Sequence, residues 1–165
     1  MSKTVVIVGA LDTKGAEFAF VKELVEAAGL RTLVVDFGVM GSPAFPPDVS
    51  RAEVAQAGGG DLARLAGGGH KDEAMQVMAN GLAAVVRRLY DEGRLDGIIG
   101  MGGSGGTSIA TTGMRTLPVG VPKVMVSTVG GGDVSAYAGT KDITFMPSIV
   151  DVAGINSISR AIYTN

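Results

Sequence analysis

Apolar positions follow two different periods along this chain, and together they predict strands that alternate with helices. Unbroken apolar segments rich in β-branched residues are typical of strands that are covered on both faces. Such segments lie at residues 4–8, 32–36, 96–100, 122–127 and 143–146. Between them, apolar side chains recur at the spacing of a helix. The sequence therefore predicts a helix that carries Phe18, Val21, Val25 and Ala28 and stops at Gly29.

The clearest helical stripe comprises Met75, Met78, Leu82, Val85 and Leu89, and it predicts a long helix that ends at Gly93, with its methionines in the core. Shorter helices are predicted at about 50–57 and 61–65, after a proline-rich loop at 37–48. A further helix is predicted to open at Gly102 and to run to about Met114. The last helix is predicted to begin at about Ile149, with Ile155, Ile158 and Ile162 on one face.

Strands that alternate with helices form right-handed βαβ units in a parallel sheet. The predicted fold is therefore α/β and doubly wound, a Rossmann-like three-layer sandwich. Its sheet is mostly parallel and has about five strands. We expect a single such domain over residues 1–165. In such a fold, ligands bind beyond the carboxyl ends of the strands, so the loops that follow the strands are where a site is expected.

Composition narrows the function classes. Net charge is −2 and no Lys or Arg block occurs, which argues against nucleic-acid partners and anionic membrane surfaces. Cysteine is absent and His70 is the only histidine, so thiolate and multi-histidine metal sites are excluded, and a cytoplasmic location is expected. Only 18% of residues are charged, which predicts surface buried in a homo-oligomer or against a second lobe, with the isoleucine face at the C-terminal end as the interface.

Glycine is the unusual residue, with 26 of 165 positions, and its clusters mark where backbone turns sharply or approaches a ligand. The strongest cluster follows a strand and opens a helix, so its N–H groups and the helix dipole favour a phosphate or carboxylate. The predicted binding residues there are Gly102, Gly103, Ser104, Gly105, Gly106 and Thr107. The alternative is a tight turn packed against a neighbouring segment.

Two named motifs overlap this cluster, and neither is complete. Gly100-x-Gly102-x-x-Gly105 matches the dinucleotide fingerprint, but no Asp or Glu lies between Gly97 and Gly132 to hold a ribose. Gly102-x-Ser104-x-Gly106 matches a hydrolase nucleophile elbow, which needs a histidine later in the chain. His70 lies before the serine, so serine hydrolysis is disfavoured. Hydride transfer is disfavoured because the ribose-binding acidic residue is missing.

The loop after the first strand, Gly9-Ala-Leu-Asp-Thr-Lys-Gly15, offers a carboxylate, a hydroxyl and an ammonium group. It is not a Walker A motif, because Lys14 precedes the last glycine. We expect Lys14 to pair with a phosphate, with Thr13 beside it, and Asp12 to hold Mg²⁺ or a ribose hydroxyl. Alternatively, Asp12 or Thr13 caps the following helix.

Two further strand ends contribute candidates. Asp36 lies where ribose-binding carboxylates occur in doubly wound folds, although a capping or solvated role is the alternative. After the fourth strand, the loop is expected to form a second wall of the site through Ser127, Gly130, Gly131, Gly132 and Asp133. Asp133 is a candidate metal ligand or helix cap. His70 is favoured as part of a mobile helix start over a catalytic base.

The three loops at 9–15, 100–107 and 127–133, in this order, resemble the UPF0261 family, also called the Tm-1-like ATP-binding domain. This resemblance implies ATP binding with Mg²⁺ in the glycine-rich region. It also implies a second α/β lobe after the segment seen here, so the chain resembles the first lobe alone. No catalysed reaction is implied.

The resulting hypothesis is a domain that binds the phosphates of ATP with Mg²⁺, with Asp12 and Asp133 as metal ligands. Two alternatives remain open. One is a non-enzymatic lobe that serves assembly or regulation, and the other is an enzyme that acts on a small phosphorylated or carboxylated metabolite.

Overall fold

All five strands of the protein lie in one parallel sheet in the order β2-β1-β3-β4-β5, and seven helices accompany them. The computed structural model describes residues 1–165. In chain order the elements are β1 Thr4–Gly9, α1 Gly15–Ala27, β2 Arg31–Asp36, α2 Arg51–Ala57, α3 Leu62–Ala66, α4 Lys71–Asp91, β3 Gly97–Gly102, α5 Ser104–Met114, β4 Lys123–Ser127, α6 Ser135–Ala138, β5 Thr144–Pro147 and α7 Ser157–Thr164.

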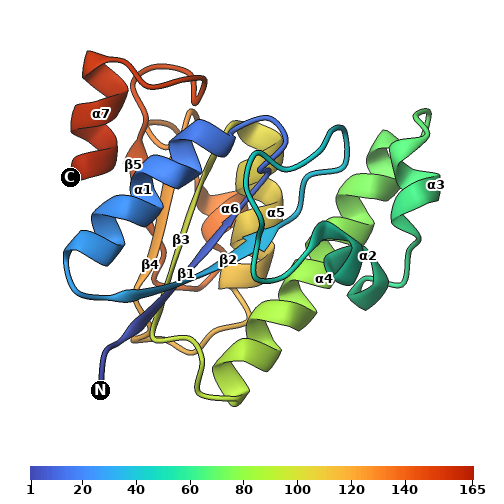
Figure 1. Cartoon of the computed structure of the whole chain (residues 1–165), viewed down its shortest axis with the longest axis horizontal. Coiled ribbons are helices and arrows are strands. Elements are labelled where there is room, and N and C mark those ends of the chain that lie inside the picture. The colour runs from blue at the N-terminus through green and yellow to red at the C-terminus, as the bar shows by residue number, and fades with distance from the viewer.

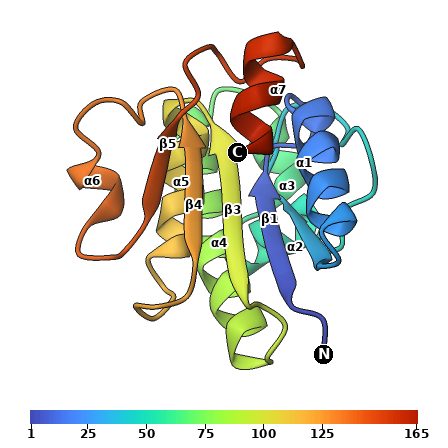
Figure 2. The ribbon, with the colours of Figure 1, turned by 90° about the vertical axis from the view of Figure 1, so that its left-hand side faces the viewer.

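Helices cover both faces of the sheet, so the predicted three-layer α/β fold is confirmed. Helices α1 and α7 lie on one face, whereas α4 and α5 lie on the other, with α2 and α3 packed beside α4 (Figure 1, Figure 2). Successive residues of β1 point to opposite faces. Val6 and Val8 join a core of 23 buried residues under α4 and α5, and Ile7 joins a second core of 9 under α1 and α7.

The last helix is shorter than predicted. Helix α7 begins at Ser157, not near Ile149, and the prediction of an earlier start is wrong. The side chain of Asn156 caps it by accepting hydrogen bonds from the backbone N–H groups of Ile158 and Ser159. Ile149 and Gly154 both have positive φ, at 66° and 81°, which interrupts any helix before that cap. The short helix α6 was not predicted.

Helix α7 packs onto α1 through a different face from the one predicted. Ser159 and Tyr163 are its buried residues, whereas Ile158 is 47% exposed. Ile155 and Ile162 are half-buried against the core under α1. The predicted isoleucine face is therefore not a continuous exposed stripe, and homo-oligomerisation stays a prediction. Among the helices, none combines the length and apolarity needed to cross a membrane.

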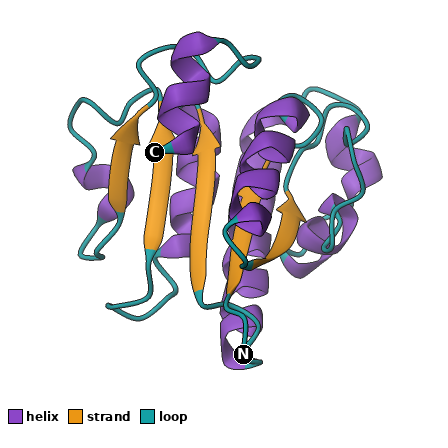
Figure 3. Cartoon of the chain, turned by 60° about the vertical axis from the view of Figure 1, so that its left-hand side comes forward, coloured by secondary structure: helices purple, strands orange, loops and turns teal.

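Parallel pairing brings the ends of β1, β3 and β4 to one edge of the sheet (Figure 3). The chain leaves β1 for β2 on one side and later returns to place β3 on the other side of β1. The strand order therefore reverses between β1 and β3, and the carboxyl ends of strands at such a reversal are where ligands bind in doubly wound folds. The glycine-rich loop follows β3 at this reversal.

Candidate functional site

The glycine-rich loop leaves several backbone donors of α5 without an acceptor. Gly103 is the N-cap residue, and no side chain caps the helix. The first backbone bond of the helix runs from the N–H of Thr107 to the carbonyl of Gly103, at 2.9 Å. The N–H groups of Ser104, Gly105 and Gly106 come before this first bond, so helix geometry gives them no acceptor inside α5, and no side chain caps them. Together with the positive end of the helix dipole, they form an anion-binding arrangement.

Close packing explains only part of this glycine cluster. A Cβ at Gly100 would lie 3.1 Å from both Ala110 Cβ and Met125 Sδ, and one at Gly102 would lie 3.2 Å from the Cα of Gly106. A Cβ at Gly103, Gly105 or Gly106 would meet no neighbour closer than 3.7 Å, and none of these three has positive φ. The fold does not need glycine at these three positions, so the tight-turn alternative leaves them unexplained.

Thr107 and Ser127 hold the loops after β3 and β4 together. Both side chains are fully buried, and their hydroxyl oxygens lie 2.6 Å apart. The Thr107 hydroxyl donates to the carbonyl of Gly103 at 2.7 Å, and the N–H of Thr128 donates to the carbonyl of Gly102 at 3.2 Å. These residues position the glycine loop, and their burial keeps them from touching a ligand directly.

The loop after β4 contains the remaining predicted glycines and Asp133. A Cβ at Gly130 would lie 3.0 Å from the backbone nitrogen of Pro147, so packing against β5 accounts for this glycine. Gly131, Gly132 and Asp133 are exposed. The carboxylate of Asp133 accepts a hydrogen bond from the N–H of Ser135 at 3.0 Å. Hydrogen bonds from the Ser135 hydroxyl and N–H hold the pKa of Asp133 below its ordinary value.

The charged groups of the loop after β1 are engaged by other parts of the chain. Asp12 Oδ2 accepts hydrogen bonds from the N–H groups of Met40 and Gly41, at 2.8 and 3.0 Å. Lys14 Nζ donates to the carbonyl oxygen of Val152 at 2.5 Å. Thr13 is exposed and makes no side-chain hydrogen bond. Lys14 would have to leave Val152 to pair with a phosphate.

Asp36 is fully buried and inaccessible to a ribose hydroxyl. Its Oδ1 accepts hydrogen bonds from the N–H groups of Leu11 and Gly38, at 3.1 and 2.9 Å. Oδ2 of Asp36 and Oδ1 of Asp12 have no partner. Burial raises the pKa of Asp36, and the nearby charge of Asp12 adds to this rise, against the lowering effect of the two N–H donors. Asp36 thus ties the loops after β1 and β2 together.

The residues expected to hold Mg²⁺, Asp12 and Asp133, lie on separate loops. No group of three or more histidine, aspartate or glutamate side chains could share a cation. Asp12 follows β1 and Asp133 follows β4, and β3 lies between these strands. Each carboxylate already accepts backbone N–H groups. Coordination of magnesium by Asp12 or Asp133 stays a prediction, and the phosphate oxygens of a nucleotide would supply further ligands.

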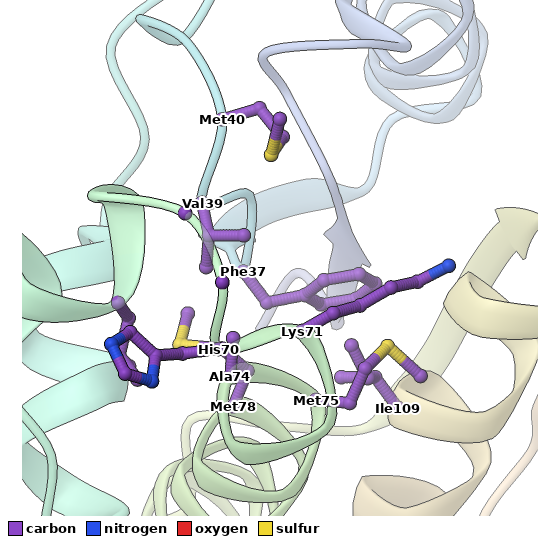
Figure 4. Close-up of a pocket in the computed structure, with 12 residues that line it drawn as sticks. Phe37, Val39, Met40, His70, Lys71, Ala74, Met75, Met78 and Ile109 are labelled. Carbon is purple, nitrogen blue, oxygen red and sulfur yellow. The ribbon is translucent and has the colours of Figure 1, made fainter.

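An apolar pocket of about 460 Å³ lies beside the glycine-rich loop (Figure 4). Its walls come from the chain after β2, from the α3–α4 segment and from α5. The lining residues are Phe37, Val39, Met40, Leu65, Gly68, Gly69, His70, Lys71, Ala74, Met75, Met78 and Ile109. The Sδ and Cε atoms of Met75 lie 3.7 Å from where a Cβ of Gly105 would be, so the pocket borders the first turn of α5.

Lys71 is a candidate that the sequence interpretation missed. It is exposed at the start of α4 and forms no ion pair within the chain. Figure 4 shows its side chain extended across the pocket in the direction of α5. His70 Nδ1, in contrast, lies 3.6 Å from a carboxylate oxygen of Glu73. The available signal was the glycine cluster at 67–69, which directly precedes these two residues.

The predicted methionine stripe of α4 divides at this pocket. Met78, Leu82, Val85 and Leu89 are buried as predicted. Met75, one turn nearer the start of the helix, is only half-buried and faces the cavity. A helical apolar stripe does not distinguish a core residue from one that lines a pocket next to that core.

Residues 3–165 match the family described as "Uncharacterised protein family (UPF0261) N-terminal domain". The chain belongs to the UPF0261 family. It is 49% identical over 165 residues to a UPF0261 protein of Clostridium tetani and 44% identical over 163 residues to UPF0261 protein RA0729 of Rhizobium meliloti. These alignments cover 100% and 99% of this chain but only 41% and 40% of the two relatives.

A plant relative shares a shorter region. The chain is similar to the ToMV resistance protein Tm-1(GCR237) of Solanum lycopersicum, with 44% identity over 92 residues. The match covers 56% of this chain and 12% of the tomato protein. The relation to Tm-1 suggested by the three loops is thereby confirmed at the level of sequence similarity.

Proposed function

We propose that this UPF0261 domain binds a phosphate-bearing small molecule at the start of α5 and that its ligand is ATP with Mg²⁺. The observation that carries the proposal is the set of three unused N–H groups at Ser104, Gly105 and Gly106. A Cβ at Gly103, Gly105 or Gly106 would meet its nearest neighbour only at 3.7 Å or more, so packing does not require glycine there. Where packing does not require glycine, the lack of a side chain still has one effect: it lets an anion approach the backbone N–H groups.

Charge and shape beside the loop support the same ligand. Lys71 supplies a cation that no carboxylate of the chain neutralises, and a lysine ammonium group is a common partner of phosphate. The adjacent pocket, at about 460 Å³, falls within the range of small-molecule sites. In this arrangement Mg²⁺ is carried by the phosphate oxygens, and the protein contributes the N–H groups and Lys71.

The family resemblance supports a nucleotide in preference to another phosphate compound, because the Tm-1-like domain is associated with ATP binding. The name of the tomato relative refers to ToMV resistance, and no such activity is proposed for this chain. An enzyme that acts on a small phosphorylated metabolite would use the same anion site, and the ligand series below separates the two.

Calorimetric titration tests the proposal with ATP, AMP, inorganic phosphate and several sugar phosphates, each with and without Mg²⁺. We expect ATP to bind most tightly and inorganic phosphate to compete with it, because both use the same N–H groups. Mg²⁺ should change ATP affinity only modestly, since in this arrangement the phosphate oxygens hold it. Tightest binding by a sugar phosphate would favour the metabolite enzyme, and no binding by any phosphate would refute the anion site.

A further inference from the structure

We infer that the apolar pocket holds the base of the bound nucleotide through apolar contact, so that the domain accepts different purine nucleoside triphosphates with similar affinity. This inference rests on the proposed function, because it assumes that phosphates lie at the start of α5. It adds the location of the base and the degree to which the site discriminates between bases.

The position of the pocket relates it to the phosphate site. Ile109 lies one helical turn after Gly105 on α5, and Met75 contacts the space above Gly105. A ligand anchored on the free N–H groups therefore lies beside Met75, in the pocket that Ile109 also lines. The rest of its body can enter the cavity toward Phe37 and Met78.

The lining is suited to an aromatic ring. Met40, Met75 and Met78 place three thioethers around the cavity, and Phe37 adds an aromatic side chain (Figure 4). Methionine contacts aromatic rings favourably and adapts its shape to different ones. A planar base of either purine type therefore finds the same kind of contact in this pocket.

The lining also contains few side chains that could read the edge of a base. His70 and Lys71 are the only polar side chains among the 12 lining residues. Lys71 extends toward α5, where the phosphates are proposed to lie. Asp36 is buried and engaged with Leu11 and Gly38, so it does not bind the ribose. Discrimination between bases by hydrogen bonds, which requires buried polar partners, is therefore weak.

The test compares the affinities of ATP, GTP and inorganic tripolyphosphate by titration calorimetry on the purified chain. We expect ATP and GTP to agree within about threefold, because apolar contact distinguishes the two bases poorly. Tripolyphosphate should bind about tenfold more weakly or worse, because it buries no apolar surface in the pocket.

A variant pair separates the pocket from the phosphate site. Met75→Ala should weaken ATP and GTP about fivefold while leaving tripolyphosphate unchanged, because a thioether contacts the base favourably but gives a phosphate neither charge nor hydrogen bond. Gln76→Ala, on the exposed side of the same helix, is the matched control and should change none of the three affinities.

The outcomes distinguish this inference from the proposed function. Equal affinity for ATP and tripolyphosphate, or a tenfold or greater preference for one purine, would overturn the pocket inference and leave the anion site in place. Equal weakening of tripolyphosphate and ATP by Met75→Ala would likewise show that Met75 acts on the phosphate site. Absence of binding by all three ligands would refute the proposed function itself.

Discussion

Two loops at the same edge of the sheet both suggested a phosphate site, and the fold uses them differently. The loop after β1 carries Asp12 and Lys14, and both side chains are hydrogen-bonded to other segments of the chain. The loop after β3 carries no charge at all between Gly103 and Thr107, yet its first-turn N–H groups are unused. Charged residues in a loop thus indicate a ligand only when the fold itself leaves them without a partner.

The reason lies in what each loop has to hold in place. Residues 37–48 and 148–156 are long connections with little regular structure, so their backbone groups need partners from elsewhere. Asp12 and Asp36 accept hydrogen bonds from backbone N–H groups of the first connection. In the second, Lys14 donates to a backbone carbonyl and Glu17 accepts from a backbone N–H. The loop after β3 leads directly into α5 and has no such connection to support.

The largest expected difference between the two loops is in how substitutions change ATP affinity, and it is expected at the glycines after β3. Gly103→Val and Gly105→Val should each weaken ATP binding by about 100-fold or more, because a side chain there blocks approach to the free N–H groups. Both variants should stay close to the parent's thermal midpoint, since the nearest neighbours of the added Cβ are side-chain atoms of Thr128 and Met75 at 3.7 Å, an ordinary contact distance. Calorimetry and a thermal melt measure the two quantities.

Gly100→Val is the matched control for these variants. Its Cβ would lie 3.1 Å from Ala110 and Met125, so overpacking should destabilise the fold by about 1–3 kcal/mol. If the valine variants at 103 and 105 fold and still bind ATP like the parent, the glycine loop is structural and the comparison of the two loops fails.

The second effect concerns two lysines. Lys71→Met should weaken ATP binding by about 10-fold to 100-fold, the range of a lost charge-assisted hydrogen bond, with little change in stability. Lys14→Met should instead lower the free energy of unfolding by about 1–2 kcal/mol, because it removes the hydrogen bond to Val152. Its ATP affinity should stay within about twofold of the parent's. Titration calorimetry and urea unfolding measure these changes. A loss of ATP affinity in the Lys14 variant would show that this ammonium leaves Val152 for the ligand.

A third effect is the pH dependence of stability, with opposite signs at two carboxyls. Burial raises the pKa of Asp36, so its contribution to stability is fully present below the ordinary value of 3.8 and is lost as pH rises through the raised pKa. Hydrogen bonds from Lys123 and Gly120 lower the pKa of Asp142 to about 2. Its contribution is present above 3.8 and is lost as pH falls toward about 2.

Urea midpoints measured from acid to neutral pH on two variants check these signs. Relative to the parent, Asp142→Asn should be least stable near neutrality and should match the parent at the acid end. Asp36→Asn should show its largest deficit at the acid end, with the deficit shrinking toward neutrality. A deficit of Asp36→Asn that grows toward neutrality, as expected for Asp142→Asn, would mean that the fold lowers the pKa of Asp36 and would contradict this prediction.

The smallest effect is expected at Thr13. Its side chain is exposed and makes no hydrogen bond, so Thr13→Ala should change stability by less than about 0.5 kcal/mol and leave ATP affinity unchanged. A measurable drop in ATP affinity would place the loop after β1 in the binding site after all.

Local patterns predicted the architecture well. The five strands, the long helix α4 and the parallel α/β fold follow from apolar periodicity, which depends on neighbouring residues alone. The glycine-rich helix start after β3 was also correctly placed at the carboxyl edge, because parallel strands bring all such loops to one side. The start of α7 was missed because a stretch of apolar residues does not reveal the positive φ of Ile149 that interrupts a helix.

The sequence by itself therefore determined the elements, their parallel arrangement and the glycine loop, because each depends on short-range spacing. Only the tertiary structure decided which polar groups remained free. Lys14 donates to the carbonyl of Val152, which lies 138 residues later in the chain, and Asp12 accepts from Met40, 28 residues later. Neither hydrogen bond could be predicted from the residues around Asp12 and Lys14. The pocket likewise combines residues after β2, at the start of α4 and in α5. Which distant segments meet is set by packing of the whole chain, and this packing left Lys71 and the N–H groups of α5 unpaired.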